Sequence, residues 1–356
     1  MNAASRPFDL ILLGASGFTG KLVAEYLIKQ YSTYEDLRWA MAGRNREKLI
    51  RTQREIGGEH IPIILADSVD QDSIDTLTAQ TRVLCSTVGP YAKYGSITVA
   101  SCVANGTHYC DLTGEVPWIR RMIDLHHTSA IQKEVRIVHC CGYDSIPSEL
   151  GVHYLQQKAL QDHGKHCTQV KTGIKASKGG LSGGTIASMT HMLEEAERDK
   201  SIYGLLFNTY GLNPRGMQEG PDQTDLRKAM YDHDFKSWKS PFIMAAINTR
   251  IVRRGHALLD HPFGRDFRYD EFVLTGDGVS GRLKAYVTAL PMSVLARAKP
   301  GSVLMKLLGR FAPKPGEGPS RTARENGYWV FELLGTLPNG DQIKARVKGD
   351  MDPGYG

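Results

Sequence analysis

The residues that most clearly suggest chemistry form a glycine-rich loop near the amino terminus, Gly14-Ala-Ser-Gly17-Phe-Thr-Gly20. The loop follows a short apolar run at residues 10–13 and precedes apolar residues at helical spacing. Between a strand and a helix, Gly14 permits the tight turn, Gly17 lets a pyrophosphate approach the backbone, and Gly20 lets helix pack on strand. The loop therefore predicts a dinucleotide site formed by Gly14, Ala15, Ser16, Gly17, Phe18, Thr19 and Gly20.

The end of the second apolar run distinguishes between the two nicotinamide dinucleotides. NAD-binding proteins place an Asp or Glu there to accept from the ribose 2′-hydroxyl, whereas this chain has Gly43 and Arg44, with Lys48 one helical turn later. Cationic side chains can form charge-assisted hydrogen bonds to a 2′-phosphate. We therefore expect NADP(H), with Gly43, Arg44 and Lys48 among its contacts. The alternative is that Arg44 is a solvated residue at the start of a helix.

A third candidate stretch, Val88-Gly89-Pro90-Tyr91, follows the fourth apolar run. It is expected at the carboxyl edge of the sheet, near the reversal of strand order where ligands bind. We therefore expect Val88, Gly89 and Pro90 beside the nicotinamide-ribose. Tyr91 is the nearest residue with a transferable proton, although a phenol with a pKa near 10 is a weak acid at neutral pH. Tyr91 is thus the candidate catalytic residue, and an aromatic lid is the alternative.

Two later stretches, residues 109–115 and 141–148, are expected to reach the same edge of the sheet. They contain polar residues, but for Asp111 and Ser148 helix capping and turn formation are the stronger interpretation. Cys140 and Cys141 are expected in the core rather than as nucleophiles.

A separate pair, Tyr154 and Lys158, matches the Tyr-x-x-x-Lys pattern of short-chain dehydrogenases, in which Lys lowers the pKa of Tyr. No serine precedes Tyr154 at that family's usual distance, so a carbonyl reductase built on this pair is kept as an alternative. Metal catalysis is not expected, because His126 and His127 diverge on a helix and no ligand motif such as H-E-x-x-H is present.

Short apolar runs alternate with helical stretches up to residue 147, and this alternation requires parallel crossovers. After Pro147 the pattern changes to strand-like segments with a few helices and a turn at 338–341. The expected strands are residues 171–176, 271–275, 281–289, 328–335 and 342–348. The predicted fold class is α/β. It comprises a Rossmann-type NADP-binding domain with a doubly wound parallel sheet (1–147) and an α+β substrate and dimerisation domain with a mixed or antiparallel sheet (148–356).

Composition limits the remaining possibilities. The 356 residues include 41% apolar and 23% charged residues, which excludes a disordered chain, a coiled coil and a collagen-like repeat. The net charge of +6 is too diffuse to indicate nucleic acid but suits an anionic ligand. Six cysteines without a C-x-x-C motif, and no signal peptide, indicate a reducing, cytoplasmic location. No apolar stretch is long enough to span a bilayer.

Residues 291–319 form a basic, apolar stretch with no acid before Glu317. Its apolar residues recur three or four apart, a spacing that is most often a core face backed by a solvated basic face. The alternative is a surface helix that docks on anionic lipid or on the acidic carrier of a thioester, which would make the protein membrane-peripheral.

Taken together, these motifs resemble the saccharopine dehydrogenase-like oxidoreductases, in particular the branch of trans-acting enoyl reductases. The resemblance rests on residues 14–20, 42–45, 87–91, 109–115, 142–148, 180–188, 315–320 and 352–356. It implies an NADP-binding Rossmann domain, a mixed α/β second domain, and hydride chemistry on lipid-like or polyketide-derived thioesters in lipid metabolism. Enzymes that form saccharopine carry a different glycine loop, so the resemblance implies no lysine-pathway activity. Members of the branch are expected to continue past residue 356 into a further helix that packs on the first domain. We therefore expect either that this helix is missing from this sequence or that this end of the chain is unusually short.

The sequence thus predicts an NADP(H)-dependent oxidoreductase that reduces an enoyl group, or a related C=N or C=O group, of a small or carrier-bound acyl substrate. A non-catalytic NADP-sensing or scaffold protein remains the alternative of a different class. We expect a homodimer, because a sheet in the second domain makes two-fold pairing the default.

Overall fold

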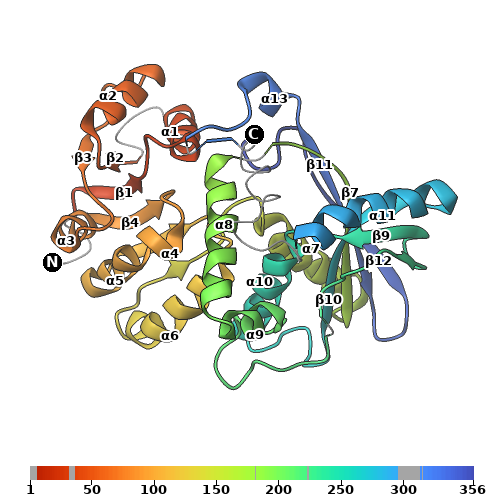
Figure 1. Ribbon diagram of the computed structural model, residues 1–356. Helices are drawn as coiled ribbons and strands as arrows, with labels where there is room; N and C mark the ends of the chain where they lie inside the picture. Colours follow the sequence, from red (N-terminus) through yellow and green to blue (C-terminus); the bar gives the residue numbers. More distant parts are fainter. Residues whose placement is uncertain (1–5, 32–36, 181, 223, 296–312, 315) are drawn as a thin grey trace. The chain divides into compact units, whose positions relative to one another are not determined.

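The computed structural model describes residues 6–31, 37–180, 182–222, 224–295, 313–314 and 316–356 (Figure 1). The chain divides into two compact units. The first comprises Met1–Gly142, Leu181–Met192 and Pro313–Gly318, and the second comprises Tyr143–Gly180, Leu193–Ala312 and Pro319–Gly356. Two segments from the second half of the sequence, 181–192 and 313–318, therefore belong to the amino-terminal unit.

The first unit contains a six-stranded sheet of order β3-β2-β1-β4-β5-β6, in which every pairing is parallel. Its strands are β1 (Phe8–Leu13), β2 (Trp39–Gly43), β3 (Ile63–Leu65), β4 (Thr81–Ser86), β5 (His108–Asp111) and β6 (Ile137–Val138). Its helices are α1 (Phe18–Gln30), α2 (Arg46–Glu55), α3 (Gln71–Ala79), α4 (Tyr91–Tyr94), α5 (Ser96–Asn105) and α6 (Val116–Gln132). The strand order reverses between β1 and β4, which confirms the predicted doubly wound sheet.

Burial explains why the amino-terminal strands read as continuous apolar runs. All five residues of β2 and the second half of β1 are buried, as expected for parallel strands covered on both faces. Leu12, Trp39, Met41 and Leu49 form part of one core cluster. Asn45 and Asp70 cap α2 and α3 by accepting hydrogen bonds from backbone amides of the first turns.

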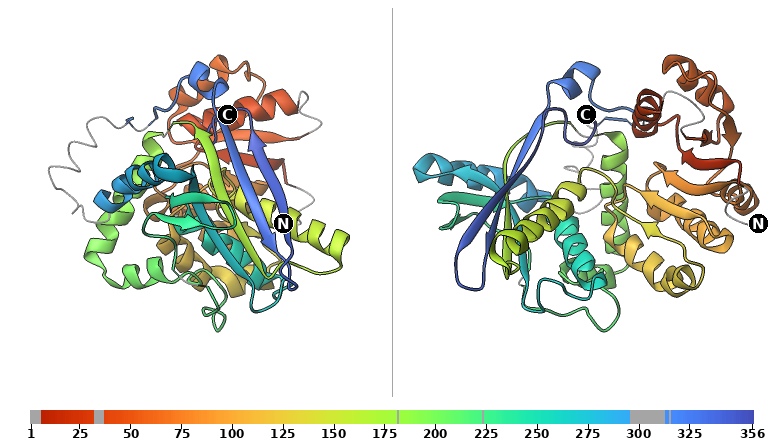
Figure 2. Two further views of the ribbon diagram at one scale, coloured as in Figure 1. Left: turned by 90° about the vertical axis from the view of Figure 1, so that its right-hand side faces the viewer. Right: turned by 180° about the vertical axis from the view of Figure 1, so that it is seen from behind.

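The second unit contains a mixed sheet of order β12-β11-β7-β10-β9-β8, in which only β7 and β10 pair in parallel. Its strands are β7 (Gln169–Lys178), β8 (Met230–Asp232), β9 (Ser237–Pro241), β10 (Arg268–Gly276), β11 (Tyr328–Thr336) and β12 (Gln342–Gly349). Its helices are α7 (Ile146–His163), α9 (Ser201–Phe207), α10 (Ala245–Leu258), α11 (Gly278–Leu295) and α13 (Arg321–Glu325). Helix α8 (Gly183–Arg198) begins in the first unit and ends in the second. Figure 2 shows α7 and α10 beside this sheet, which they contact through β10, β11 and β12.

One predicted strand is wrong, because residues 281–289 lie within helix α11. The buried positions of this segment are Gly281, Ala285 and Ala289, which are four residues apart, a helical and not a strand period. Their small side chains let the helix lie close to β9 and β10. The neighbouring Val and Tyr residues favour a strand by composition, but they remain exposed.

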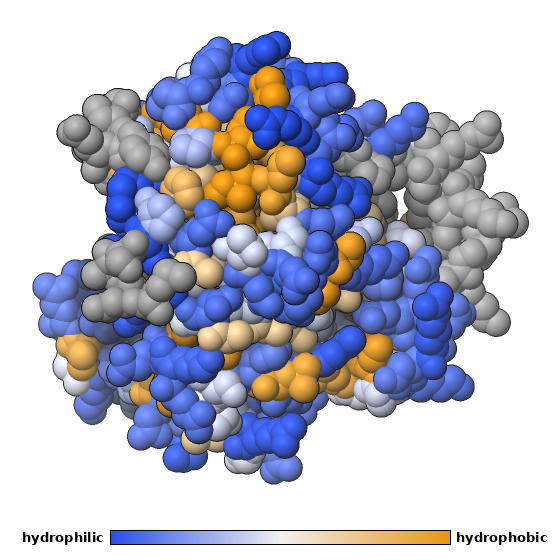
Figure 3. All heavy atoms as spheres, turned by 90° about the vertical axis from the view of Figure 1, so that its left-hand side faces the viewer, coloured by the Kyte–Doolittle hydropathy of each residue, from blue (hydrophilic) through white to orange (hydrophobic). Residues whose placement is uncertain are grey.

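Hydrophilic side chains cover most of the face drawn in Figure 3, and apolar side chains gather there in small patches. In the part of the chain that the structure describes, no helix is both long and apolar enough to cross a membrane. Residues 296–312, most of the basic stretch predicted over 291–319, lie outside the described residues.

Candidate functional site

The glycine-rich loop joins β1 to α1 at the point where the strand order reverses. Gly14 has a φ of +90°, which favours glycine, and its amide donates to the carbonyl of Ala42 at 2.9 Å. A Cβ at Gly14 would lie 2.8 Å from both Thr87 Oγ1 and Val88 Cγ2. The loop therefore lies directly against the end of β4, as the turn role predicted for Gly14 requires.

Gly17 and Gly20 differ in the space around them. A Cβ at Gly20 would lie 2.1 Å from the Gly14 carbonyl oxygen, so Gly20 is needed for helix and loop to pack. A Cβ at Gly17 would meet only that same oxygen, at 3.3 Å, and Gly17 is exposed at the amino-terminal end of α1. Helix α1 has no side-chain cap and no acidic residue in its first turn. Its positive end is thus open to an anion, and these residues fit a pyrophosphate.

Two segments distant in sequence pack beside this loop and the end of β4 within the first unit. A Cβ at Gly318 would lie 2.3 Å from the ring of Phe18, and one at Gly89 would lie 3.6 Å from Ser188 Oγ. The amide of Gly183 donates to the carbonyl of Glu317 at 3.0 Å, which joins the two segments. Both belong to stretches on which the family resemblance rests, but residue spacing alone does not indicate that they lie beside Phe18 and Gly89.

Arg44 and Lys48 are exposed after the end of β2. Asn45, between them, accepts a hydrogen bond from the amide of Lys48 at 2.9 Å and so fixes the start of α2. Among the described residues, neither cation has an ion-pair partner. Gly43 is buried and ends β2. The arrangement leaves two cations available for a 2′-phosphate.

The surroundings of Tyr91 do not favour a role as proton donor. The residue is only 4% exposed, and its hydroxyl donates to the carbonyl of Ser86 at 3.0 Å. Burial, with a smaller effect from Asp111, raises the pKa of Tyr91 well above its usual value of 10. Its backbone amide donates to Glu115 at 2.8 Å at the start of α4. Burial against a backbone carbonyl thus favours neither a proton donor nor a lid, and the catalytic role of Tyr91 stays a prediction.

Asp111 and His139 form a polar pair at the carboxyl edge of the same sheet. His139 Nδ1 lies 2.7 Å from Asp111 Oδ2, and both side chains are almost fully buried. Asp111 Oδ1 also accepts from the amides of Thr113 at 3.1 Å and Cys140 at 3.2 Å. Asp111 thus holds the segment after β5 against the segment after β6. His139 was missed in the sequence because its partner lies 28 residues away.

The second unit contains buried acids that the sequence did not identify. Ser148, expected to cap a helix, is fully buried and donates to Glu271 at 3.1 Å. Asn248 donates to the same carboxyl oxygen at 2.9 Å. Burial raises the pKa of Glu271 to about 7 and that of Glu149 to about 8. Among the described residues, Glu149 Oε2 has no hydrogen-bond partner.

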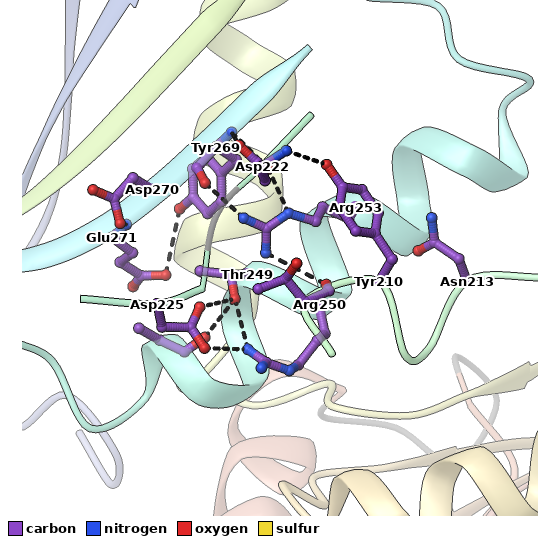
Figure 4. A network of polar contacts seen from close by, with 12 residues as sticks. Tyr210, Asn213, Asp222, Asp225, Thr249, Arg250, Arg253, Tyr269, Asp270 and Glu271 are labelled. Carbon is purple, nitrogen blue, oxygen red and sulfur yellow. Dashed lines mark hydrogen bonds and ion pairs between the residues drawn. The ribbon is translucent and has the colours of Figure 1, made fainter. Parts of the chain in front are cut away.

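Two buried arginines of α10 are engaged in ion pairs (Figure 4). Arg250 Nη1 lies 2.6 Å from Asp225, and Arg253 Nε lies 2.6 Å from Asp222. Arg253 also donates to the carbonyl of Tyr269 at 2.7 Å. These contacts tie the segment before β8 to α10 and β10, so neither cation is free to bind an anionic substrate.

Tyr154 and Lys158 do not form the pair that a short-chain dehydrogenase needs. Tyr154 is exposed on α7, and Lys158 Nζ lies 3.1 Å from Asp162 on the same helix. The lysine is therefore paired with a carboxylate, and no observation favours this alternative.

Sequence comparison places the chain in a known family. Residues 10–138 match the family model of the saccharopine dehydrogenase NADP binding domain. A Mycobacterium tuberculosis protein provisionally named as a trans-acting enoyl reductase is 40% identical, over all of this chain and 87% of its own. The trans-acting enoyl reductase of Mycobacterium leprae is 33% identical, over 99% of this chain and 86% of its own. Apo saccharopine dehydrogenase (L-Glu forming) from Saccharomyces cerevisiae covers 98% of this chain and 87% of its own, with 13% identity and a TM-score of 0.47.

Proposed function

This chain belongs to the saccharopine dehydrogenase-like oxidoreductases, in the branch of the trans-acting enoyl reductases, and we propose that it reduces the activated double bond of an acyl thioester. That it is an NADP-dependent oxidoreductase follows from the family. The observations that carry the proposal are the open helix end at Gly17 and the exposed cations Arg44 and Lys48, which have no ion-pair partner among the described residues, in a chain whose relatives bear the enoyl reductase name.

In this proposal the residues of the first unit bind and orient the cofactor. The first turn of α1, with Ser16, Gly17 and Thr19, holds the pyrophosphate, and Arg44 with Lys48 holds the 2′-phosphate. Val88, Gly89 and Pro90 lie along the nicotinamide half. When bound, NADPH supplies a hydride, which adds to the β-carbon of the enoyl group while the α-carbon takes up a proton.

The burial of Tyr91 and its hydrogen bond to Ser86 argue against this residue as the source of the proton, and we propose solvent instead. If solvent delivers the proton, no side chain of the protein is required as an acid. A lipid-like or carrier-bound acyl chain is the substrate class that we propose, on the basis of the relatives' names.

The test is a screen of enoyl thioesters, aldehydes and imines with NADPH, in which the loss of reduced nicotinamide is followed by absorbance. We expect turnover with an enoyl thioester and a saturated acyl product by mass spectrometry. Turnover with aldehydes or imines alone would reassign the reaction to a carbonyl or imine group. If no acceptor is reduced but NADP⁺ and NADPH bind with different affinities, the sensor alternative would replace the enzyme.

A further inference from the structure

Helix α11 leaves a stripe of large apolar side chains exposed. The buried positions of its described part are Gly281, Ala285 and Ala289, which face the sheet of the second unit. The apolar stripe, by contrast, is between 53% and 85% exposed and consists of Val279, Leu283, Tyr286, Val287 and Leu290. At 3.6 residues per turn, the stripe lies roughly 140° around the helix from the buried positions. It therefore faces away from the sheet that the helix covers.

Contacts on the inner side fix this orientation. A Cβ at Gly281 would lie 2.1 Å from the carbonyl oxygen of Gly276, and Thr275 Oγ1 donates to the carbonyl of Gly281 at 2.9 Å. Ala285 is completely buried. Figures 1 and 2 show α11 at the outer edge of the second sheet, beside β9. The helix cannot rotate to bury the stripe without losing these contacts.

Two cations flank the stripe, and one acid, Asp277, lies just before the helix. Arg282 and Lys284 lie on either side of it, and the guanidinium of Arg282 lies 5.4 Å above the ring of Trp238. From residue 278 to residue 316 the sequence contains seven Lys and Arg residues and no Asp or Glu. Apolar residues flanked by cations, with an aromatic ring alongside, are the pattern of a helix that lies in the interface of an anionic membrane.

We propose that α11 is a docking surface for an anionic lipid bilayer. A second copy of the chain is a poorer occupant, because it would bring Arg282 and Lys284 against the same two cations with only Asp277 nearby to offset them. An acidic protein would have to supply a groove of its own for this convex helix, whereas a bilayer needs none. A bilayer accepts a convex apolar stripe, and its anionic headgroups meet the flanking cations.

The test is co-sedimentation of the full chain with phosphatidylcholine vesicles that contain or lack phosphatidylglycerol, at low and high salt. We expect binding only to the anionic vesicles, and less binding at high salt. The variant Leu283→Asn/Val287→Asn should bind about tenfold more weakly, because it removes two exposed apolar side chains. Arg282→Gln/Lys284→Gln should weaken binding to anionic vesicles by about tenfold as well.

The matched control is Leu125→Asn, which removes an equally exposed leucine from α6 and should bind like the wild type. All variants change exposed residues, so their melting temperatures and NADPH affinities should stay unchanged. Wild-type binding by Leu283→Asn/Val287→Asn would place the contact outside α11 and overturn the proposal. Equal binding to uncharged vesicles would overturn it too. A lack of binding to anionic vesicles would also overturn it. If the chain instead self-associates or binds an acidic carrier protein, and these substitutions abolish that association, the occupant of α11 would be a protein.

Discussion

Gly17 and Gly20 stand three residues apart in one loop, yet the structure predicts opposite consequences for a methyl group at each. We expect Gly17→Ala to fold normally and to lose cofactor affinity. Gly20→Ala should instead destabilise the folded first unit. The comparison separates the binding role of the loop from its structural role.

The magnitudes follow from the space at each Cβ. At Gly20 the new atom would lie 2.1 Å from the Gly14 carbonyl oxygen and 2.9 Å from Ala15 Cα, so backbone must move. Overpacking of this kind costs about 1–3 kcal/mol, and each kcal/mol lowers Tm by about 2–4 °C in a domain of this size. At Gly17 the closest atom is 3.3 Å away and φ is −79°, which any residue adopts. The cost there should stay below about 1 kcal/mol.

Cofactor affinity distinguishes the two roles. In Gly17→Ala the methyl group occupies the space that the pyrophosphate needs, and we expect NADPH binding to weaken at least tenfold, or about 1.4 kcal/mol. Fluorescence titration with NADPH and thermal melts measure the two quantities. The control is Gly204→Ala, where a Cβ meets nothing within 4 Å. Unchanged NADPH affinity in Gly17→Ala, or wild-type stability in Gly20→Ala, would refute the reasoning.

Arg44→Ala should weaken NADPH binding at least tenfold, about 1.4 kcal/mol, and leave NADH binding nearly unchanged, because only NADPH carries the 2′-phosphate. Equal losses in titrations with both cofactors would contradict this. Tyr91→Phe should keep the rate of NADPH oxidation within about threefold. It should lower Tm by a few degrees, because the Ser86 carbonyl loses a buried donor; a large rate loss at unchanged Tm would restore a catalytic role. Glu149→Gln should flatten the pH dependence of stability in urea unfolding. Burial raises the native pKa of this carboxyl to about 8 from 4.5, so between these values the unfolded state ionises while the native state stays neutral. The free energy of unfolding of the wild type should therefore fall as the pH rises from about 4.5 to about 8, by at most about 1.4 kcal/mol per pH unit. Parallel plots of unfolding free energy against pH for variant and wild type would contradict this.

The sequence by itself determined the elements of the first unit and the nature of its ligand loop. Strands β1 and β2 read as apolar runs because parallel strands are buried on both faces, and this pattern is local. The glycine spacing of residues 14–20 and the cation at Arg44 are local too. A short stretch of chain therefore carries enough information to predict a Rossmann-type sheet and NADP(H).

Only the tertiary structure decided how distant residues meet and what surrounds each side chain. It placed segments 181–192 and 313–318 in the first unit, joined Asp111 to His139, and buried the Tyr91 hydroxyl against a backbone carbonyl. It also showed that residues 281–289 form a helix, because their small residues pack on a sheet that local composition does not reveal. Burial and pKa depend on neighbours brought together from the whole chain, so residue types and spacing alone could identify Tyr91 as a candidate but could not test its role.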